Sequence, residues 1–198
     1  MRSVCQANAE LPGFPELNKD VKTDVLIIGD GIAGILTAHF LHQNGVKYIL
    51  AEKDRICSGT TGNTTAKITF QHGLIYWKIL KGGGSEAAGK YLDANRSAFE
   101  KYAEMCRNIE CNYEIKDNYV YSVKDRKKLE NEMDALRRIG CKAEFCEKLP
   151  IPVRTAGAVK FPEQAQFDPL KATPHKDRLT ALYGVALNIF PRLLLFLR

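Results

Sequence analysis

The sequence predicts an α/β protein that opens with a dinucleotide-binding βαβ unit and continues into an α+β region with an antiparallel sheet. An unbroken apolar run at 25–28 is typical of a strand buried on both faces of a parallel sheet. The glycine-rich turn at 29–34 follows directly and leads into a helical stretch through Leu41, which Gly45 ends. A second apolar strand at 48–50 precedes an acid two residues later. This order of strand, glycine turn, helix, strand and acid is that of a dinucleotide-binding unit.

Each residue of the glycine turn has an expected role in such a unit. Gly29 permits the tight turn, Gly31 lets backbone amides approach a pyrophosphate, and Gly34 lets the helix pack closely against the strand. Glu52 is placed to accept hydrogen bonds from a ribose 2′-OH. Asp30 would put a negative charge beside the pyrophosphate, which costs affinity unless the side chain turns to solvent. The alternative interpretation is a glycine turn that binds no ligand.

The composition is that of an ordinary globular protein, 45% hydrophobic and 26% charged, and 198 residues allow one domain or one and a half. The net charge of +6 does not predict nucleic-acid binding, because basic residues mix with acids, as in 124–128. Such mixing is typical of a solvated helix face. No stretch has the length of a membrane span, so membrane insertion is not expected.

The six cysteines form no CxxC pair and show no metal-ligand spacing, which predicts no metal site. The first twenty residues are polar and contain prolines, without the apolar core of a signal peptide. We therefore expect reduced thiols in a cytoplasmic protein.

A segment rich in glycine and hydroxyl side chains, 55–67, follows the second strand on the cofactor side of such a sheet. Composition alone favours a flexible loop. Together, however, the glycine turn, Glu52 and the Arg-x-x-x-Gly-x-Thr pattern that begins at Arg55 resemble the N-terminal part of FAD-dependent oxidoreductases of the D-amino-acid oxidase (DAO) type. That family includes glycine oxidase and sarcosine oxidase relatives. The sequences at 63–69 and 71–73 are similar to a bacterial subgroup that is often fused to a Rieske domain.

The resemblance covers about residues 20–171. It implies a Rossmann-like FAD-binding βαβ domain with part of an inserted α+β substrate domain, and with the C-terminal half of the family fold missing. The cofactor is then FAD. Carried over by position, the cofactor-binding candidates are Gly29, Asp30, Gly31, Ile32, Ala33, Gly34, Glu52, Lys53, Ser58, Gly59, Thr60, Thr64, Thr65, Ala66 and Lys67.

The catalytic residues are not identified by the sequence, and two side chains are weak candidates. A lysine near the flavin, Lys67, could stabilise negative charge on the reduced ring, and His72 could act as an acid or base. The alternatives are a lysine on a loop and a histidine satisfied by local partners.

Short strands alternating with helices are expected beyond the glycine segments, as in an antiparallel sheet domain. The expected elements are a flexible break at 82–84, a helix over 85–107, strands over 111–116 and 119–123 joined by a turn at 117–118, a helix capped by Asp125 and ended by Gly140, and strands over 142–146 and 158–161. Tyr119 and Tyr121 could line a substrate site, although tyrosines at alternating strand positions are more often packing residues.

We expect an N-terminal arm at 1–22, an FAD-binding segment at 23–84, a substrate-domain-like segment at 85–171 and an atypical tail at 172–198. In the family, the Asp-Pro-Leu turn that begins at Asp168 starts a long helix returning to the nucleotide-binding domain. The tail departs from that pattern and reads as a frameshift or truncation, with an amphipathic membrane-binding segment as the alternative. The chain has no Rieske ligand pattern, so no iron–sulfur centre is expected.

The function that the resemblance implies is hydride transfer from an amine or amino acid, a small-molecule substrate, to flavin. This chain would be an N-terminal fragment with weak FAD binding and little or no turnover. The alternatives are a non-catalytic nucleotide-binding module and an inactive truncated remnant. The residues do not reveal the substrate itself, the electron acceptor or the oligomeric state.

Overall fold

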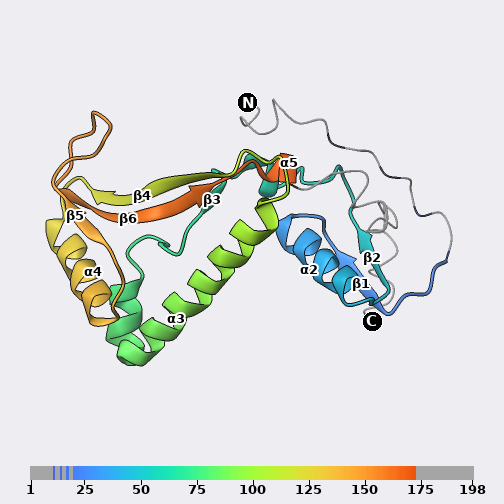
Figure 1. Ribbon diagram of the computed structural model, residues 1–198, viewed down its shortest axis with the longest axis horizontal. Helices are drawn as coiled ribbons and strands as arrows, with labels where there is room; N and C mark the ends of the chain where they lie inside the picture. The colour runs from blue at the N-terminus through green and yellow to red at the C-terminus, as the bar shows by residue number, and fades with distance from the viewer. Residues whose placement is uncertain (1–10, 12–13, 15–16, 18–19, 173–198) are drawn as a thin grey trace. The chain divides into compact units, whose positions relative to one another are not determined.

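The computed structural model describes residues 11, 14, 17 and 20–172 (Figure 1). The chain divides into two units, one formed by 1–66 with 168–198 (unit 1) and the other by 67–167 (unit 2). Nearly all of the expected arm, and all of the expected tail except Ala172, lie outside the described residues. The expected segment boundary after residue 84 falls inside a helix, whereas the boundary between the units lies after Ala66.

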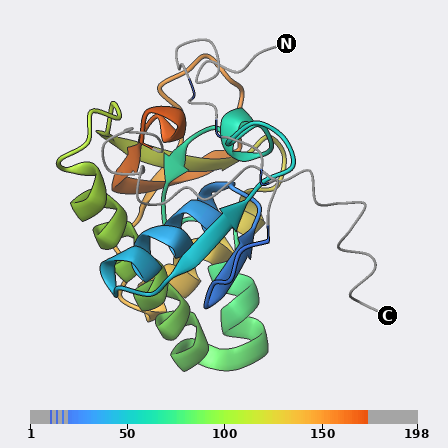
Figure 2. The same cartoon turned by 90° about the vertical axis from the view of Figure 1, so that its right-hand side faces the viewer.

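Unit 1 contains the predicted βαβ arrangement. Its elements are β1 (Val25–Ile28), α2 (Ile32–Gln43), β2 (Tyr48–Ala51), the 3-10 turn η1 (Thr61–Asn63) and α5 (Pro169–Ala172). Strands β1 and β2 pair in parallel, and α2 packs along them (Figure 2). Gly45 ends α2 as expected, with φ +67° and with the amide of Val46 donating to the Leu41 carbonyl at 3.0 Å.

The expectation that β1 is buried on both faces is wrong for the described residues. Leu26 is 46% exposed and Ile28 is 61% exposed, while Ile27 points into the core with Ile35 and Leu50. Among the described residues, α2 packs on the face of this two-stranded sheet that carries Ile27, whereas Leu26 and Ile28 on the other face are exposed. An apolar run predicts a strand, but neighbouring elements decide how many faces are covered.

Helix α5 joins the core of unit 1. Asp168 begins it, because its Oδ1 accepts hydrogen bonds from the amides of Leu170 at 3.0 Å and Lys171 at 3.3 Å. Leu170 is 1% exposed and packs in the same cluster as Ile27 and Ile35. The chain therefore returns to unit 1 at the Asp-Pro-Leu turn, as the family pattern implied.

Unit 2 is an antiparallel sheet with two helices packed on it. Its elements are β3 (Lys67–Ile68), α3 (Tyr76–Cys106), β4 (Glu114–Ser122), α4 (Arg126–Arg138), β5 (Glu144–Cys146) and β6 (Gly157–Gln166). Strand β6 is central and pairs with each of the other three strands (Figure 1). Its Val159 and Phe161 are fully buried against Leu92 of α3 and Leu136 of α4. This arrangement confirms the predicted antiparallel α+β segment.

Helix α3 is longer than expected. It begins at Tyr76, and the predicted flexible break is a kink at Gly84, where φ is +76°. The helix start is stabilised from outside the segment, because Glu132 of α4 accepts hydrogen bonds from the amides of Tyr76 at 3.0 Å and Trp77 at 2.8 Å. A partner more than fifty residues away in sequence could not be read from local pattern.

The two strands expected at 111–116 and 119–123 are a single strand, β4. The predicted turn at 117–118 is instead a register irregularity between Lys116 and Asn118. Asp117 accepts a hydrogen bond from the amide of Glu163 at 3.2 Å and pairs with Lys160 at 2.9 Å. Opposite this bulge β6 continues through Pro162 to Gln166, beyond the predicted end at 161. Polar turn residues were thus misread, because a bulge uses the same residue types as a turn.

The remaining helix was predicted correctly. Asp125 caps α4 by accepting a hydrogen bond from the amide of Lys128 at 3.1 Å, and Gly140 follows the helix with φ +67°. Leu129 and Leu136 on its predicted apolar face are completely buried. Among the described helices, none combines the length and apolar character needed to cross a bilayer.

Candidate functional site

The glycine turn has the close contacts that the sequence predicts. Gly29 has φ +98°, and its amide donates to the Ala51 carbonyl at 2.7 Å, which ties the turn to the end of β2. A Cβ atom at Gly34 would lie 1.9 Å from the Gly29 carbonyl oxygen. Only glycine allows α2 to pack this tightly onto the turn, and the N-terminus of α2 therefore lies directly beyond β1.

Thr61 caps α2 from the second glycine segment. Its Oγ1 accepts a hydrogen bond from the amide of Ile32 at 2.9 Å, and a Cβ at Gly31 would lie 3.4 Å from that oxygen. Thr61 is 7% exposed, whereas the neighbouring candidate Thr60 is exposed. Thr61 is the threonine of the Arg-x-x-x-Gly-x-Thr pattern that begins at Arg55, but it was not among the predicted cofactor-binding residues, which included Thr60 instead.

Glu52 is anchored by three backbone amides. Its Oε1 accepts from Lys53 at 2.8 Å and from Asp54 at 3.0 Å, and its Oε2 accepts from Asp30 at 3.1 Å. Burial works to raise the pKa of Glu52, but these hydrogen bonds outweigh burial and lower the pKa. Each carboxylate oxygen can accept two hydrogen bonds, so Oε2 retains capacity for a ribose hydroxyl.

Asp30 does not turn to solvent. Its side chain is 6% exposed, and its Oδ1 accepts a hydrogen bond from the amide of Cys57 at 3.0 Å. Burial raises the pKa of Asp30 to about 6, and the nearby Glu52 carboxylate adds to this rise while the Cys57 amide opposes it. The carboxyl of Asp30 therefore stays inside the turn, and its negative charge is not removed from the expected pyrophosphate site by pointing to solvent.

The other cofactor-binding candidates of unit 1 lie on or beside these elements. Ile32 and Ala33 begin α2, while Lys53 is exposed and pairs with Asp54 at 3.3 Å. In the second segment, hydrogen bonds from Asn63 to the Gly59 carbonyl and from the Ala66 amide to Thr64 Oγ1 give the loop local structure. Ala66 is buried with φ +57°, whereas three further candidates in this segment are exposed, namely Ser58, Gly59 and Thr65.

The two weak catalytic candidates lie in unit 2. Lys67 is exposed on β3, where it pairs with Gln166 of β6. His72 is exposed too, and its Nδ1 lies 2.8 Å from the Tyr91 hydroxyl. Their proposed roles stay predictions.

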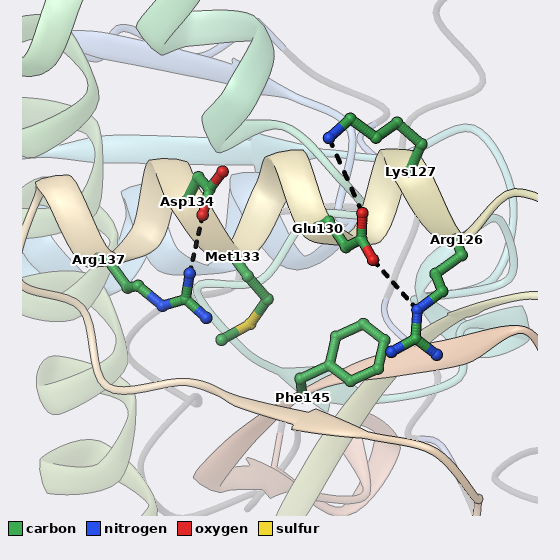
Figure 3. Close-up of a pocket in the computed structure, with 7 residues that line it drawn as sticks. All are labelled: Arg126, Lys127, Glu130, Met133, Asp134, Arg137 and Phe145. Carbon is green, nitrogen blue, oxygen red and sulfur yellow. Dashed lines mark hydrogen bonds and ion pairs between the residues drawn. The ribbon is translucent and has the colours of Figure 1, made fainter.

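A hollow of about 360 Å³ in unit 2 lies between α4 and β5 (Figure 3). Met133 and Phe145 supply its apolar surface, and Arg126 stacks over the Phe145 ring at 4.6 Å. The charged side chains that line it pair with one another, as Arg126 and Lys127 do with Glu130 and as Arg137 does with Asp134 (Figure 3). Across the part of the chain that the structure describes, no three metal-ligating side chains gather in one place.

Comparison with known proteins identifies the family. Residues 24–186 match the family model described as FAD dependent oxidoreductase, DAO. The match runs beyond Lys171, where we expected the resemblance to end. The curated protein YhfW of Bacillus subtilis (strain 168), whose name assigns it provisionally to the Rieske 2Fe-2S iron–sulfur proteins, is 35% identical over 170 residues. This alignment covers 84% of the chain but only 33% of YhfW.

Two solved structures share the fold. Glycine oxidase from Bacillus cereus superposes with a TM-score of 0.58 at 22% identity, over 84% of this chain and 46% of the oxidase. L-amino acid deaminase from Proteus vulgaris superposes with a TM-score of 0.62 at 15% identity, over 90% of this chain and 42% of the deaminase. The chain thus spans less than half the length of these enzymes, and it belongs to the DAO family of FAD-dependent oxidoreductases.

Proposed function

We propose that unit 1 binds the ADP portion of FAD and that the chain serves in hydride transfer from an amine or amino acid to the flavin. The observation that carries this proposal is the glycine turn. Glycine at position 34 lets α2 pack directly on the turn, where a Cβ would lie 1.9 Å from the Gly29 carbonyl oxygen. The hydrogen bond from the Gly29 amide to the Ala51 carbonyl ties the turn to the end of β2, so the N-terminus of α2 lies at the end of β1. Such a helix terminus attracts a pyrophosphate through its free amides and its dipole.

The residues of unit 1 fit an ADP-containing cofactor. The first turn of α2, with Ala33 and Gly34, would face the pyrophosphate, and Oε2 of Glu52 would accept from the ribose. Thr61 uses its oxygen as an acceptor, which leaves its hydroxyl proton for a phosphate oxygen. Candidates from Ser58 to Thr60 and from Thr64 to Lys67 would follow the rest of the cofactor. The flavin supplies the hydride acceptor, and the protein residues bind and orient it.

The proposal extends to the substrate class and the cellular location. The fold neighbours include an oxidase of glycine and a deaminase of L-amino acids, which favours an amine or amino acid as the small-molecule substrate. Tyr119 and Tyr121 alternate on β4 and would contribute to a substrate site. A cytoplasmic location, expected from the cysteine pattern of the sequence, stays part of the proposal.

The first test is an absorbance spectrum of the purified protein after incubation with FAD and desalting. Bands near about 370 and 450 nm that stay with the protein would show retained flavin. Competition experiments then identify which part of FAD the protein binds: ADP should displace FAD, whereas FMN should not. A substrate screen that follows flavin bleaching tests the hydride-transfer step.

The outcomes separate the alternatives. Binding of ADP or NAD without retention of FAD would favour a non-catalytic nucleotide-binding module. A protein that is folded by circular dichroism but binds none of these ligands would contradict the proposal and favour an inactive remnant. FAD retention without bleaching by any amine or amino acid would leave the cofactor assignment standing and would contradict the hydride-transfer step for this chain.

A further inference from the structure

Asp30 connects three parts of the candidate dinucleotide site. Its backbone lies in the glycine turn, and its amide donates to Oε2 of Glu52 at 3.1 Å, which ties the turn to the end of β2. Its Oδ1 accepts from the amide of Cys57 at 3.0 Å, and Cys57 Sγ lies 3.5 Å from the Asp30 carbonyl oxygen. Cys57 begins the stretch that carries Thr61 to the N-terminus of α2. One residue thus holds the second glycine segment against the first.

Among the residues that the structure describes, no cationic side chain pairs with the carboxyl of Asp30. The turn contributes only glycines beside it, and the first turn of α2 carries no acidic or basic side chain. From β2 and the residues after it come Glu52, whose carboxylate faces Asp30, and the exposed pair Lys53 and Asp54. From the second segment come the exposed Arg55 and the buried Cys57 thiol. The groups that face Asp30 directly are therefore an acid, a thiol and an amide.

We propose that Asp30 is a positioning residue of the dinucleotide site, which holds the second glycine segment in place through Cys57 and makes dinucleotide affinity depend on protonation of its own carboxyl. The inference rests on the proposed function. A charged Asp30 repels both Glu52 and an incoming pyrophosphate, whereas a protonated Asp30 removes this repulsion and can donate to Glu52. Its pKa, raised to about 6, places this change just below neutral pH.

The test measures FAD affinity by flavin fluorescence between about pH 5.5 and pH 8, with exchange of the 55–63 amides followed by mass spectrometry. For the native protein, affinity should rise about five- to tenfold as pH falls, because one charge near the pyrophosphate is lost. Asp30→Asn keeps the acceptor for Cys57 and removes the charge. It should bind FAD at pH 8 as tightly as the native protein does at pH 5.5, without pH dependence.

Asp30→Ala separates the two roles. Like Asp30→Asn it carries no charge, but it leaves the Cys57 amide without its acceptor. The amides of 55–63 should therefore exchange faster than in Asp30→Asn, and FAD should bind more weakly than to Asp30→Asn at every pH. Asp24→Asn is the matched control, because Asp24 is an exposed acid of unit 1 at the opposite end of β1, and it should behave as the native protein.

Two results would overturn the proposal. A native affinity that does not change with pH, or that changes equally in Asp30→Asn, removes the role of the carboxyl proton. Equal exchange of 55–63 in Asp30→Ala and Asp30→Asn removes the positioning role, and this readout needs no FAD. If the native protein binds no FAD at any pH, the proposed function fails together with the affinity part, while the exchange comparison still decides the positioning part.

Discussion

Each unit buries a carboxylate that accepts hydrogen bonds from backbone amides, but the two carboxylates have different surroundings. In unit 2, Glu132 is completely buried and accepts from two amides at the N-terminus of α3. In unit 1, Asp30 accepts from one loop amide and faces a second acid, Glu52. Burial raises the pKa of both carboxyls, whereas only the pKa of Asp30 is raised further by a neighbouring acid.

The difference shows that a buried acid can stabilise a helix terminus, as Glu132 does, or position parts of a binding site, as we propose for Asp30. The helix terminus offers Glu132 a positive dipole and two amide donors, and these hydrogen bonds oppose the effect of burial on its pKa. Asp30 has one such donor and a neighbouring acid, and it lies in the turn that we propose binds a pyrophosphate. Glycine use differs in the same way, since Gly34 is required by a close backbone contact in unit 1 and Gly84 by its φ in unit 2.

The largest expected effect is that of Glu132→Ala on unit 2. The substitution leaves the amides of Tyr76 and Trp77 without an acceptor in a buried environment, so the free energy of unfolding should fall by about 3 kcal/mol. Urea unfolding followed by Trp77 fluorescence measures it. Glu132→Gln retains one acceptor and should lose less, and the half-buried Glu130→Gln on the same helix should change stability by less than about 0.5 kcal/mol. Native stability in Glu132→Ala would show that the cap is unimportant.

Gly34→Ala should destabilise unit 1 by about 2–3 kcal/mol, because its Cβ would overlap the Gly29 carbonyl and force α2 away from the turn. Hydrogen exchange of amides in β1 and β2 should accelerate, while exchange in β4 and β6 stays as in the native protein. Equal acceleration of amide exchange in both units would contradict the prediction that Gly34 stabilises unit 1 alone.

The raised pKa of Asp30 predicts how the stability of unit 1 depends on pH. The pKa of Asp30 is about 6 in the folded protein, against an ordinary value of 3.8, so the folded state binds the proton more tightly than the unfolded state. The contribution of this proton to the stability of unit 1 is therefore lost as pH rises through about 6. Asp30→Asn should therefore be more stable than the native protein above pH 6, by about 3 kcal/mol, with the difference vanishing below about pH 4. Hydrogen exchange of unit 1 at several pH values measures this. A constant difference across that range would contradict the prediction.

The smallest effects concern the glycines of α3. Gly84→Ala should cost about 1 kcal/mol because alanine is disfavoured at φ +76°. Gly89→Ala is the matched control, since Gly89 is helical with open space around its Cβ position, and it should stabilise unit 2 by about 0.5–1 kcal/mol. Thermal unfolding of the two variants compares them. Similar shifts in both would mean that the kink does not depend on its glycine.

Prediction from sequence succeeded where contacts are close along the chain. The glycine turn, the ends of α2 and the cap of α4 at Asp125 depend on residues within a few positions of one another, and their patterns are specific. It failed where a distant partner decides the conformation. The bulge at Asp117 depends on Glu163, and the early start of α3 depends on Glu132.

By itself, the sequence determined the βαβ unit, the tight turn at Gly29, the close packing at Gly34 and the family to which the chain belongs, because these follow from local backbone requirements and from a short motif. Only the tertiary structure decided that Asp30 turns inward to Cys57, that Thr61 rather than Thr60 meets α2, and that one face of β1 is exposed. Direction and burial of a side chain depend on elements that fold against it from elsewhere in the chain, and residue type alone does not specify those neighbours.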